Sequence, residues 1–269
     1  MSIKSVLQNL YAKGVLPLSW LEEPFSFSAN KKDLVKLKGK FKGERCFIIG
    51  NGPSLNDNNL NFLKGEYTFG VNSIFYKTQD MGFKPTFYVV EDGHVVDDNL
   101  EEINNFRAEY KFFPSAYKGK IKQDENTLYF NMNRGFYEEY SPNHEMPRFS
   151  RDASQVLYCG QSVTIINLQL AFYLGFTEVY LIGMDFNYVI PDTATVDGNT
   201  IISNEDDCNH FDGRYFGKGK KWHDPMLENV LASYKLCDAV YTRHGRKVFN
   251  ATFGGKLEVF ERVDYDSLF

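Results

Sequence analysis

The stretch Cys46-Phe-Ile-Ile-Gly-Asn-Gly-Pro-Ser-Leu55 decides the fold. Its apolar start, Cys46 to Ile49, is typical of a buried strand, and the turn from Gly50 to Pro53 follows, with Ser54 at the position of a helix N-cap. Doubly wound α/β domains open their phosphate site in this way, because glycine permits close backbone approach and free N–H groups attract an anion. A plain tight turn is the alternative explanation of the same residues.

Short apolar runs recur along the chain, with periodic segments between them that predict helices. We expect strands at residues 46–49, 67–72, 85–92, 111–114, 127–131, 178–183 and 247–250, and helices at 60–63, 100–110, 165–174 and 226–237. The helix at 165–174 has Ser162 or Thr164 near its N-cap and Gly175 as its stop. This alternation predicts an α/β fold with a single doubly wound, mostly parallel sheet.

The remaining segments suggest how the chain is divided. Residues 1–40 are expected to form an N-terminal helical extension, 41–250 the α/β domain and 251–269 a C-terminal tail. Within the domain, residues 132–158 read as a long loop, and residues 189–221 are predicted to form a lid because they are polar, glycine-rich and aperiodic.

A basic run, Lys31 to Lys40, closes the expected N-terminal extension. It predicts a solvated helix whose Leu34, Val35 and Leu37 face the body. Peripheral attachment to a membrane surface that carries a lipid acceptor is the alternative.

The composition excludes several classes of protein. A net charge of −5 argues against broad nucleic-acid binding, and 16% aromatic residues predict that rings line a cleft. The four cysteines form no C-x-x-C pair, so we expect reduced core cysteines such as Cys46 and Cys159. Since the sequence shows neither a signal peptide nor a run of about 20 apolar residues, we expect a cytoplasmic protein.

Polar residues follow four of the expected strands, and they are Asn51 and Ser54, Asn72 and Ser73, Glu91 and Asp92, and Asp185. The carboxyl ends of parallel strands share one edge of the sheet, where the helix start at Ser162 and Thr164 would join them. This edge predicts a nucleotide pocket with an anion-binding floor. The patterns G-x-G-x-x-G, G-x-x-x-x-G-K-[ST] and G-x-S-x-G are absent, which disfavours NAD binding, a P-loop kinase and a serine hydrolase.

His223, in the segment Trp222-His-Asp-Pro225, is the candidate general base. Histidine titrates near neutral pH and can take a proton from a hydroxyl, although a loop-anchoring histidine would look the same. The other candidates are weaker: His94, His144 and His244 are expected at the surface, and Asp264-Tyr-Asp266 is interpreted as a chance D-x-D pair in the tail.

A metal site is the alternative use of the polar residues around His223. Its candidate ligands are Cys208, His210, Asp212, His223 and Asp224. Their spacing matches no standard zinc pattern, so we predict no bound metal.

Three segments resemble the bacterial sialyltransferases of the Campylobacter lipooligosaccharide type, glycosyltransferase family 42. They also resemble the wider MptE-like (DUF115) group, which includes the central domain of flagellin-modifying motility accessory factors and an archaeal pterin diphosphokinase. The segments are Ile48–Leu55, Asn72 and Leu181-Ile-Gly-Met-Asp-Phe186, and the resemblance spans residues 44–240. It implies a Rossmann-like, GT-A-like domain that binds a CMP-sugar and needs no cofactor.

The resemblance also implies roles for individual residues. The donor-binding set is Gly50, Asn51, Gly52, Pro53, Ser54, Asn72, Ser73, Glu91, Asp92, Gln161, Ser162, Thr164, Asp185 and Phe186. Within it, Asn51, Gly52 and Ser54 are expected to hold phosphate and ribose. His223 matches the catalytic histidine, and Tyr188 or Tyr215 is expected to donate a hydrogen bond to the departing phosphate.

The chain departs from the sialyltransferase pattern at three places. Asn187 intervenes before Tyr188, where the sialyltransferases have a tyrosine directly after Asp-Phe. At the end of the third strand, acidic Glu91 and Asp92 replace an asparagine. Gly160 or Gln161 stands where an arginine is expected. These changes leave the sugar open.

Three functions follow from the resemblance. The first is inverting, metal-independent transfer of a nonulosonic or related keto-acid sugar from CMP to a glycan, lipid-linked or protein acceptor. Such an enzyme would serve cell-surface polysaccharide biosynthesis at the inner face of the membrane, with a homo-oligomer allowed. The second is a pterin diphosphokinase in which Glu91, Asp92 and Asp185 hold Mg²⁺ against ATP. The third is a non-catalytic nucleotide-binding scaffold.

Overall fold

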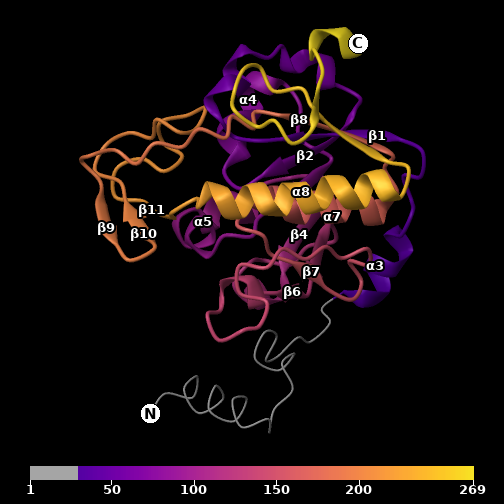
Figure 1. Ribbon diagram of the computed structural model, residues 1–269, viewed down its shortest axis with the longest axis horizontal. Coiled ribbons are helices and arrows are strands. Elements are labelled where there is room, and N and C mark those ends of the chain that lie inside the picture. Colours follow the sequence, from indigo (N-terminus) through magenta and orange to yellow (C-terminus); the bar gives the residue numbers. More distant parts are fainter. Residues whose placement is uncertain (1–29) are drawn as a thin grey trace, which may run out of the picture.

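The computed structural model describes residues 30–269 and is built around one sheet of eight parallel strands (Figure 1). The order across this sheet is β13-β12-β8-β1-β2-β3-β4-β5. The strands are β1 Arg45–Ile49, β2 Tyr67–Val71, β3 Phe87–Val89, β4 Tyr110–Pro114, β5 Thr127–Phe130, β8 Glu178–Ile182, β12 Lys247–Asn250 and β13 Glu261–Arg262. The predicted α/β fold is confirmed, and every neighbouring pair in this sheet is parallel.

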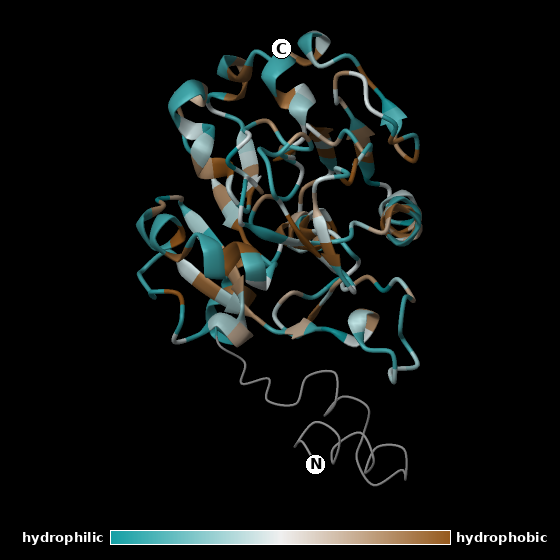
Figure 2. Cartoon of the chain, turned by 90° about the vertical axis from the view of Figure 1, so that its left-hand side faces the viewer, coloured by the Kyte–Doolittle hydropathy of each residue, from teal (hydrophilic) through white to brown (hydrophobic). Residues whose placement is uncertain are grey.

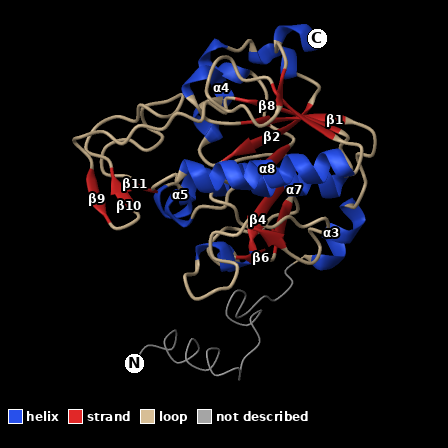
Figure 3. Ribbon diagram, in the orientation of Figure 1, coloured by secondary structure: helices blue, strands red, loops and turns tan. Residues whose placement is uncertain are grey.

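Helices cover both faces of the sheet, because successive side chains of each strand point to opposite sides. Cys46 and Ile48 belong to the buried cluster on one face, and Phe47 and Ile49 to the cluster on the other. The first face carries α3 Lys31–Leu37, α7 Val163–Leu174 and α8 Leu227–Arg243. The second carries α4 Thr78–Met81, α5 Gly93–Asp98, α6 Leu100–Asn105 and the 3₁₀ helices η1 Pro53–Asp57, η2 Leu60–Leu63 and η3 Ile74–Tyr76. Figure 3 shows α8 lying across the first face, and Figure 2 shows hydrophobic residues concentrated in the central strands.

The order of the strands creates a switch point between β1 and β8. The chain builds β1 to β5 outward in sequence order, and α7 then returns it so that β8 pairs with the free side of β1. Loops after β1 and β8 therefore leave the sheet in opposite directions. In open α/β sheets, ligands bind in the crevice that this divergence opens.

Helix α7 is apolar on all sides, as expected for a buried helix. The Ser162 side chain caps it by accepting a hydrogen bond from the Thr164 N–H at 3.3 Å. Gly175 ends it with φ of 106°, a left-handed conformation that glycine adopts without a steric penalty. The predicted start and stop of this helix are confirmed.

The predicted lid has secondary structure of its own. Strands β9 Thr195–Asp197, β10 Thr200–Ile202 and β11 Lys221–His223 form a small antiparallel sheet, which projects beside α5 in Figure 1. Ile201 and Trp222 are paired in register and are both buried. These apolar side chains explain why a segment with so many turn residues folds.

Residues 132–158 are largely irregular, as predicted. They contain the short pair β6 Met132–Asn133 and β7 Leu157–Tyr158, with the 3₁₀ turn η5 Gly135–Tyr137. Two further 3₁₀ turns are η4 Ser115–Tyr117 and η6 Asp266–Leu268.

Several boundaries differ from those predicted. The helix expected at 100–110 ends at Asn105 and is preceded by α5, while α8 runs six residues beyond Cys237 to Arg243. Residues 251–269 are no loose tail, since Leu257 and Phe260 are buried and β13 extends the sheet. Val35 of α3 is 51% exposed, so only Leu34 and Leu37 face the body.

Three further predictions concern the N-terminal extension, the cysteines and membrane-spanning helices. Residues 1–29 of the predicted N-terminal helical extension lie outside the described residues. All four cysteines are free, and Cys46 and Cys159 are buried as predicted. Within residues 30–269, no helix combines the length and the apolar character that crossing a bilayer requires.

Candidate functional site

A cavity of about 310 Å³ lies at the carboxyl ends of β1, β2 and β8, against the start of α7 and the inner side of the lid. The predicted site residues that line it are Gly50, Asn51, Gly52, Asn72, Glu91, Asp92, Gln161, Ser162, Thr164, Asp185, Phe186, Tyr188, Tyr215 and His223. Pro53, Ser54 and Ser73 do not line it. Aromatic rings form much of its wall, as the composition predicted: Tyr137, Phe186, Tyr188, Tyr215, Phe216, Trp222 and Tyr234.

The glycine-rich corner after β1 is closed by the protein itself. The Gly52 N–H donates to the Gly183 carbonyl at 2.9 Å. Ser54 donates from its backbone N–H to Asp185 Oδ1 at 3.2 Å and from its hydroxyl to Asp185 Oδ2 at 2.7 Å. Ser54 is also no helix N-cap, because η1 begins at Pro53 with Gly52 as its cap. The expectation that Ser54 helps to hold phosphate and ribose stays a prediction, and in this structure the carboxylate of Asp185 accepts from both hydrogen-bond donors of Ser54.

Two buried amide oxygens lie where β1 and β2 end. Asn51 donates from Nδ2 to the Val71 carbonyl at 3.0 Å and to the Tyr215 hydroxyl at 2.9 Å, which fixes the orientation of its amide. Its Oδ1, like Oδ1 of Asn72, is buried with no hydrogen-bond partner in the described chain. A buried acceptor without a donor costs about 1–3 kcal/mol. These two oxygens suit a ligand that offers hydroxyl or amino groups.

Backbone strain is concentrated at the cavity. Among residues 30–269, positive φ at a non-glycine position occurs at Asn72, Glu145, Gln161, Phe186 and Met226. Asn72, Gln161 and Phe186 line the cavity, with φ of 48°, 69° and 54°. Such conformations cost about 1–3 kcal/mol each and persist where the surroundings enforce them, which is typical of ligand sites.

The start of α7 is the part of the cavity best suited to an anion. Ser162 and Thr164 line the cavity, and this twelve-residue helix directs the positive end of its dipole toward them. Gln161, which precedes the Ser162 cap of α7, is held in place because its Nε2 donates a hydrogen bond to the Asp224 carbonyl at 3.1 Å.

Glu91 lines the cavity as predicted, and its neighbours Tyr137 and Arg134 were not predicted. It is 8% exposed and accepts a hydrogen bond from the Tyr137 hydroxyl at 3.1 Å. Burial raises the pKa of Glu91 to about 7, and the charge of Asp92 adds to this effect. Arg134, beside Tyr137, also lines the cavity. Both lie in the irregular segment 132–158, where no periodicity marked them.

We expect Glu91→Gln to stabilise the protein at alkaline pH. The folded-state pKa of about 7 lies above the ordinary glutamate pKa of about 4.5, so ionisation of Glu91 opposes folding increasingly as pH rises through this window. The variant should gain about 1–2 kcal/mol over wild type at pH 8 and almost nothing at pH 4. Urea unfolding at both pH values measures this, with the exposed Glu139→Gln as control. A gain that is equal at both pH values would contradict the burial of an ionisable Glu91.

The lid contributes a stacked pair of rings beneath Asn51. The ring of His210 lies 3.9 Å from that of Tyr215 with an interplanar angle of 3°. Tyr215 is 2% exposed and its hydroxyl is occupied by Asn51, whereas Tyr188 is 38% exposed. Of the two tyrosines predicted to face the departing phosphate, Tyr188 is therefore the more exposed residue, and its hydroxyl lies 3.2 Å from His210 Nε2.

The alternative metal cluster around His210 does not assemble. Cys208 is exposed, and Asp212 is paired with Arg214 at 2.6 Å. Across residues 30–269, no group of three or more His, Cys, Asp or Glu side chains is placed to hold a metal ion.

His223 ends β11 and faces the cavity from the lid. Its ring lies 4.5 Å from the ring of His94, which stands in the first turn of α5. The expectation of a surface position for His94 is wrong, since it is half-buried and its Nε2 is enclosed without a partner in the described chain. No local pattern marked this pairing, because 129 residues separate the two histidines.

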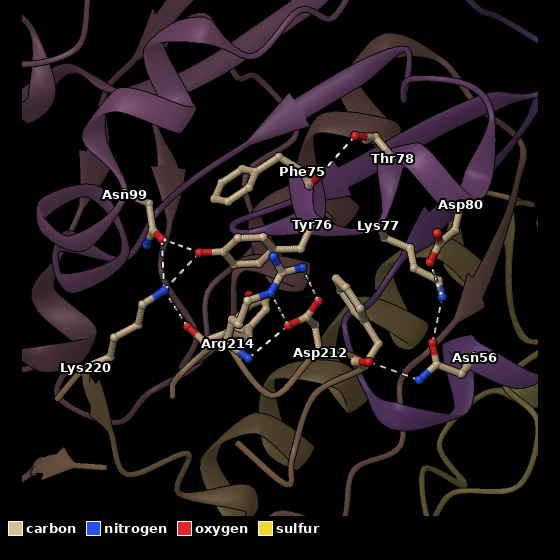
Figure 4. A network of polar contacts seen from close by, with 12 residues as sticks. Asn56, Phe75, Tyr76, Lys77, Thr78, Asp80, Asn99, Asp212, Arg214 and Lys220 are labelled. Carbon is tan, nitrogen blue, oxygen red and sulfur yellow. Dashed lines mark hydrogen bonds and ion pairs between the residues drawn. The ribbon is translucent and has the colours of Figure 1, made fainter. Parts of the chain in front are cut away.

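Polar contacts fasten the lid to the sheet domain (Figure 4). Lys220 donates from Nζ to the Tyr76 hydroxyl at 3.2 Å and to Asn99 Oδ1 at 3.1 Å, and the Arg214 guanidinium lies 4.5 Å from the centre of the Tyr76 ring. On the other side, Asn56 donates from Nδ2 to the Phe211 carbonyl at 3.0 Å. In this structure the lid is therefore folded over the cavity.

Comparison with known families agrees with this fold. Residues 25–191 match the family described as 6-hydroxymethylpterin diphosphokinase MptE-like. The chain belongs to the MptE-like family. The suspected relationship to this group is thereby confirmed. Among curated proteins, none matches the sequence of this MptE-like chain.

Two solved structures resemble the MptE-like chain. The MAf glycosyltransferase from Magnetospirillum magneticum AMB-1 has a TM-score of 0.51 and 15% identity, and the match covers 98% of this chain and 42% of the other. The sialyltransferase CstII from Campylobacter jejuni, in complex with the substrate analogue CMP-3FNeuAc, has a TM-score of 0.44 and 13% identity over 82% and 86% of the two chains. The MptE-like chain thus spans less than half the length of the MAf protein, and at such identities the likeness concerns the fold alone.

Proposed function

We propose that this protein transfers a sugar from a CMP-activated donor to a hydroxyl acceptor. The observation that carries this proposal is that one cavity is lined by the start of α7 and by Asn51 and Asn72, whose buried amide oxygens have no partner in the described chain. A nucleoside monophosphate presents both complements, hydroxyl or amino donors at one end and an anion at the other. The glycosyltransferase fold of the MAf protein agrees with the proposal.

In the proposed complex, the nucleoside donates hydrogen bonds to Asn51 and Asn72. The phosphate lies at the N-terminus of α7, near Ser162 and Thr164, rather than at the corner that Asp185 closes. A phosphodiester carries a single negative charge, so the helix dipole and a hydrogen bond from Tyr188 suffice without a metal ion.

The donor sugar in this proposal is a nonulosonic or related keto-acid sugar, which carries a carboxylate of its own. Arg134 is the one lysine or arginine among the residues that line the described cavity, and we assign it to that carboxylate.

His223 removes the proton of the acceptor hydroxyl while CMP departs from an oxocarbenium-like centre, which inverts the anomeric configuration. The folded lid excludes water, whose attack would hydrolyse the donor. The acceptor is a glycan, a lipid-linked sugar or a protein, and we place the enzyme in the cytoplasm at the inner face of the membrane, with self-association open.

A pterin diphosphokinase is the second candidate, and the acidic groups of the cavity favour it. Glu91, Asp92 and Asp185 would hold Mg²⁺ against ATP. However, Asp185 already accepts two hydrogen bonds from Ser54, and the pKa of Glu91 near 7 makes it a weaker ligand at neutral pH. A non-catalytic nucleotide-binding scaffold is the third candidate.

We expect CMP and CDP to stabilise the protein without metal. At a concentration about 100 times Kd, a ligand adds about 2.7 kcal/mol to the free energy of unfolding, which a thermal-shift assay detects as a rise in Tm of several degrees. Asn72→Ala should lose most of this rise, whereas Asn61→Ala, an exposed residue outside the cavity, should keep it.

Other results of the same assay point to the other candidates. Stabilisation by Mg-ATP alone would support the diphosphokinase and overturn the transferase. Stabilisation by CMP in a protein that turns over no CMP-sugar, and is indifferent to the loss of His223, would support the scaffold.

A further inference from the structure

We propose that Asp207, His210 and Tyr188 form a proton relay inside the lid, which supplies the hydrogen bond and the proton that the departing phosphate takes up. The inference rests on the proposed transfer reaction. It assigns Asp207 and His210, which neither the fold nor the family resemblance assigns, as positioning residues that act through Tyr188.

The three side chains lie in a line that leads into the cavity. His210 Nδ1 lies 2.7 Å from Asp207 Oδ2, and His210 Nε2 lies 3.2 Å from the Tyr188 hydroxyl. His210 is 8% exposed and Tyr188 is 38% exposed, so the series runs from the buried carboxylate of Asp207 to a partly exposed tyrosine. Both His210 and Tyr188 line the cavity.

Asp207 fixes the orientation of the imidazole. Its carboxylate accepts from the backbone N–H groups of Asn209 at 2.8 Å and Phe216 at 2.9 Å as well as from His210. Burial alone would raise the pKa of Asp207, but the hydrogen bond and charge of His210, together with the backbone N–H groups of Asn209 and Phe216, outweigh burial and keep this pKa below its usual value. An ionised carboxylate only accepts hydrogen bonds, so Nδ1 of His210 carries a proton and Nε2 faces Tyr188.

The role of Tyr188 then depends on the charge of His210. When the imidazole is neutral, Nε2 accepts and the Tyr188 hydroxyl proton is directed at it. When the imidazole is protonated, Nε2–H donates to the Tyr188 oxygen, and the phenolic proton is free to point at a phosphate oxygen. The protonated relay thus places positive charge one residue behind the leaving group.

The proton balance of one turnover closes. The bond between the anomeric carbon and the phosphate oxygen breaks, and its electron pair stays on that oxygen. Tyr188 gives its proton to the oxygen and takes one from Nε2 of His210, which becomes neutral. His223 takes the acceptor proton as the new glycosidic bond forms, and exchange with water returns both histidines to their starting states.

The surroundings of the relay contain few other charges. Besides Asp207, the side chains packed on His210 are Tyr188, Tyr215 and Phe216. Asp185 and Tyr234 also face Tyr188 from the domain body, and Lys220 contacts the backbone of Tyr215 at 3.2 Å. In the part of the chain that the structure describes, the ion pair of the His210 side chain is with Asp207, and neither His210 nor Tyr188 forms a hydrogen bond or ion pair with an arginine or lysine side chain.

The test is an NMR titration of the histidines in the full chain, with and without CMP. We expect CMP to shift the imidazole ¹⁵N resonances of His210 toward those of a ring protonated at both nitrogens in wild type, because its phosphate draws the Tyr188 proton and leaves Nε2–H to donate. Tyr188→Phe should abolish this response, and Asp207→Asn should weaken it. The exposed His144, outside the cavity, is the reference signal in the same spectra.

Turnover gives the second readout. His210→Gln keeps a hydrogen-bond donor but does not titrate, so kcat should fall about tenfold with KM unchanged, and the alkaline limb of the kcat–pH profile should disappear. If His210→Gln is poorly folded, Tyr188→Phe, which removes one hydroxyl, replaces it.

The outcomes separate this relay from the proposed function. CMP that stabilises the protein but leaves the His210 signal unchanged would overturn the relay and leave the transferase standing. CMP that does not bind at all would overturn the transferase, and with it the role of the relay at a leaving phosphate.

Discussion

Replacing His223 by alanine is expected to lower kcat for sugar transfer by about 10²–10⁴-fold. General base catalysis contributes about this much when the base is held within reach of the proton that it removes. The imidazole of His223 lines the cavity from the end of β11, and that of His94 packs against it at 4.5 Å. Binding of CMP should be almost unchanged, since His223 serves the acceptor side. Initial rates with a CMP-sugar donor, and CMP affinity by calorimetry, measure the two effects.

The control for this variant is His144→Ala, an exposed histidine outside the cavity. Added imidazole should restore part of the activity of His223→Ala. The His144→Ala protein should have the full activity of wild type without it. The acid limb of the kcat/KM–pH profile should also vanish in His223→Ala. A His223→Ala protein with wild-type kcat would remove the general-base assignment.

The second large effect concerns stability. Gly183→Ala is expected to lower the free energy of unfolding by about 3 kcal/mol, or Tm by roughly 6–12 °C, through strain and overpacking. Gly183 has φ of 65°, and a Cβ placed there would lie 2.6 Å from the Gly50 carbonyl oxygen. The two nearest atoms, the carbonyl oxygen and carbon of Gly50, belong to the backbone. They therefore cannot move away without disturbing the ends of β1 and β8.

Gly245→Ala separates the two causes of this loss. Gly245 has φ of 66° but nothing within 4 Å of an added Cβ, so it should lose only about 1 kcal/mol. Chemical denaturation of both variants provides the comparison. Equal losses would mean that backbone conformation alone, and no close approach of the two loops, requires glycine at position 183.

The sheet was predictable because its strands are short apolar runs separated by periodic helices. Buried parallel strands leave such a signal, and Ser162 and Gly175 mark the ends of α7 with side-chain and backbone chemistry that is local in sequence. The edge of the cavity was predictable for the same reason. Once strands are parallel, the residues that follow them, such as Asn51 and Asn72, must meet.

The contacts that could not be predicted join residues that are far apart in the sequence. Asp185 closes the glycine corner from 131 positions away, and the pairing of His94 with His223 crosses from α5 to the lid. Neither contact leaves a local pattern. The lid strands contain three residues each, which is too few for a hydrophobic period to be recognised. The rings of His210, Tyr215 and Trp222 in the lid agree only with the prediction from composition that aromatic residues line a cleft.

The position of His223 at the end of a lid strand has a consequence for the proposed reaction. Thr200 of β10 pairs with His223 of β11, so the small lid sheet and the group proposed to start the chemistry are one piece of structure. A swing of that sheet away from the body would withdraw the base at the moment when solvent enters. The resting protein would then be harmless to its own activated substrate, with no separate safeguard required.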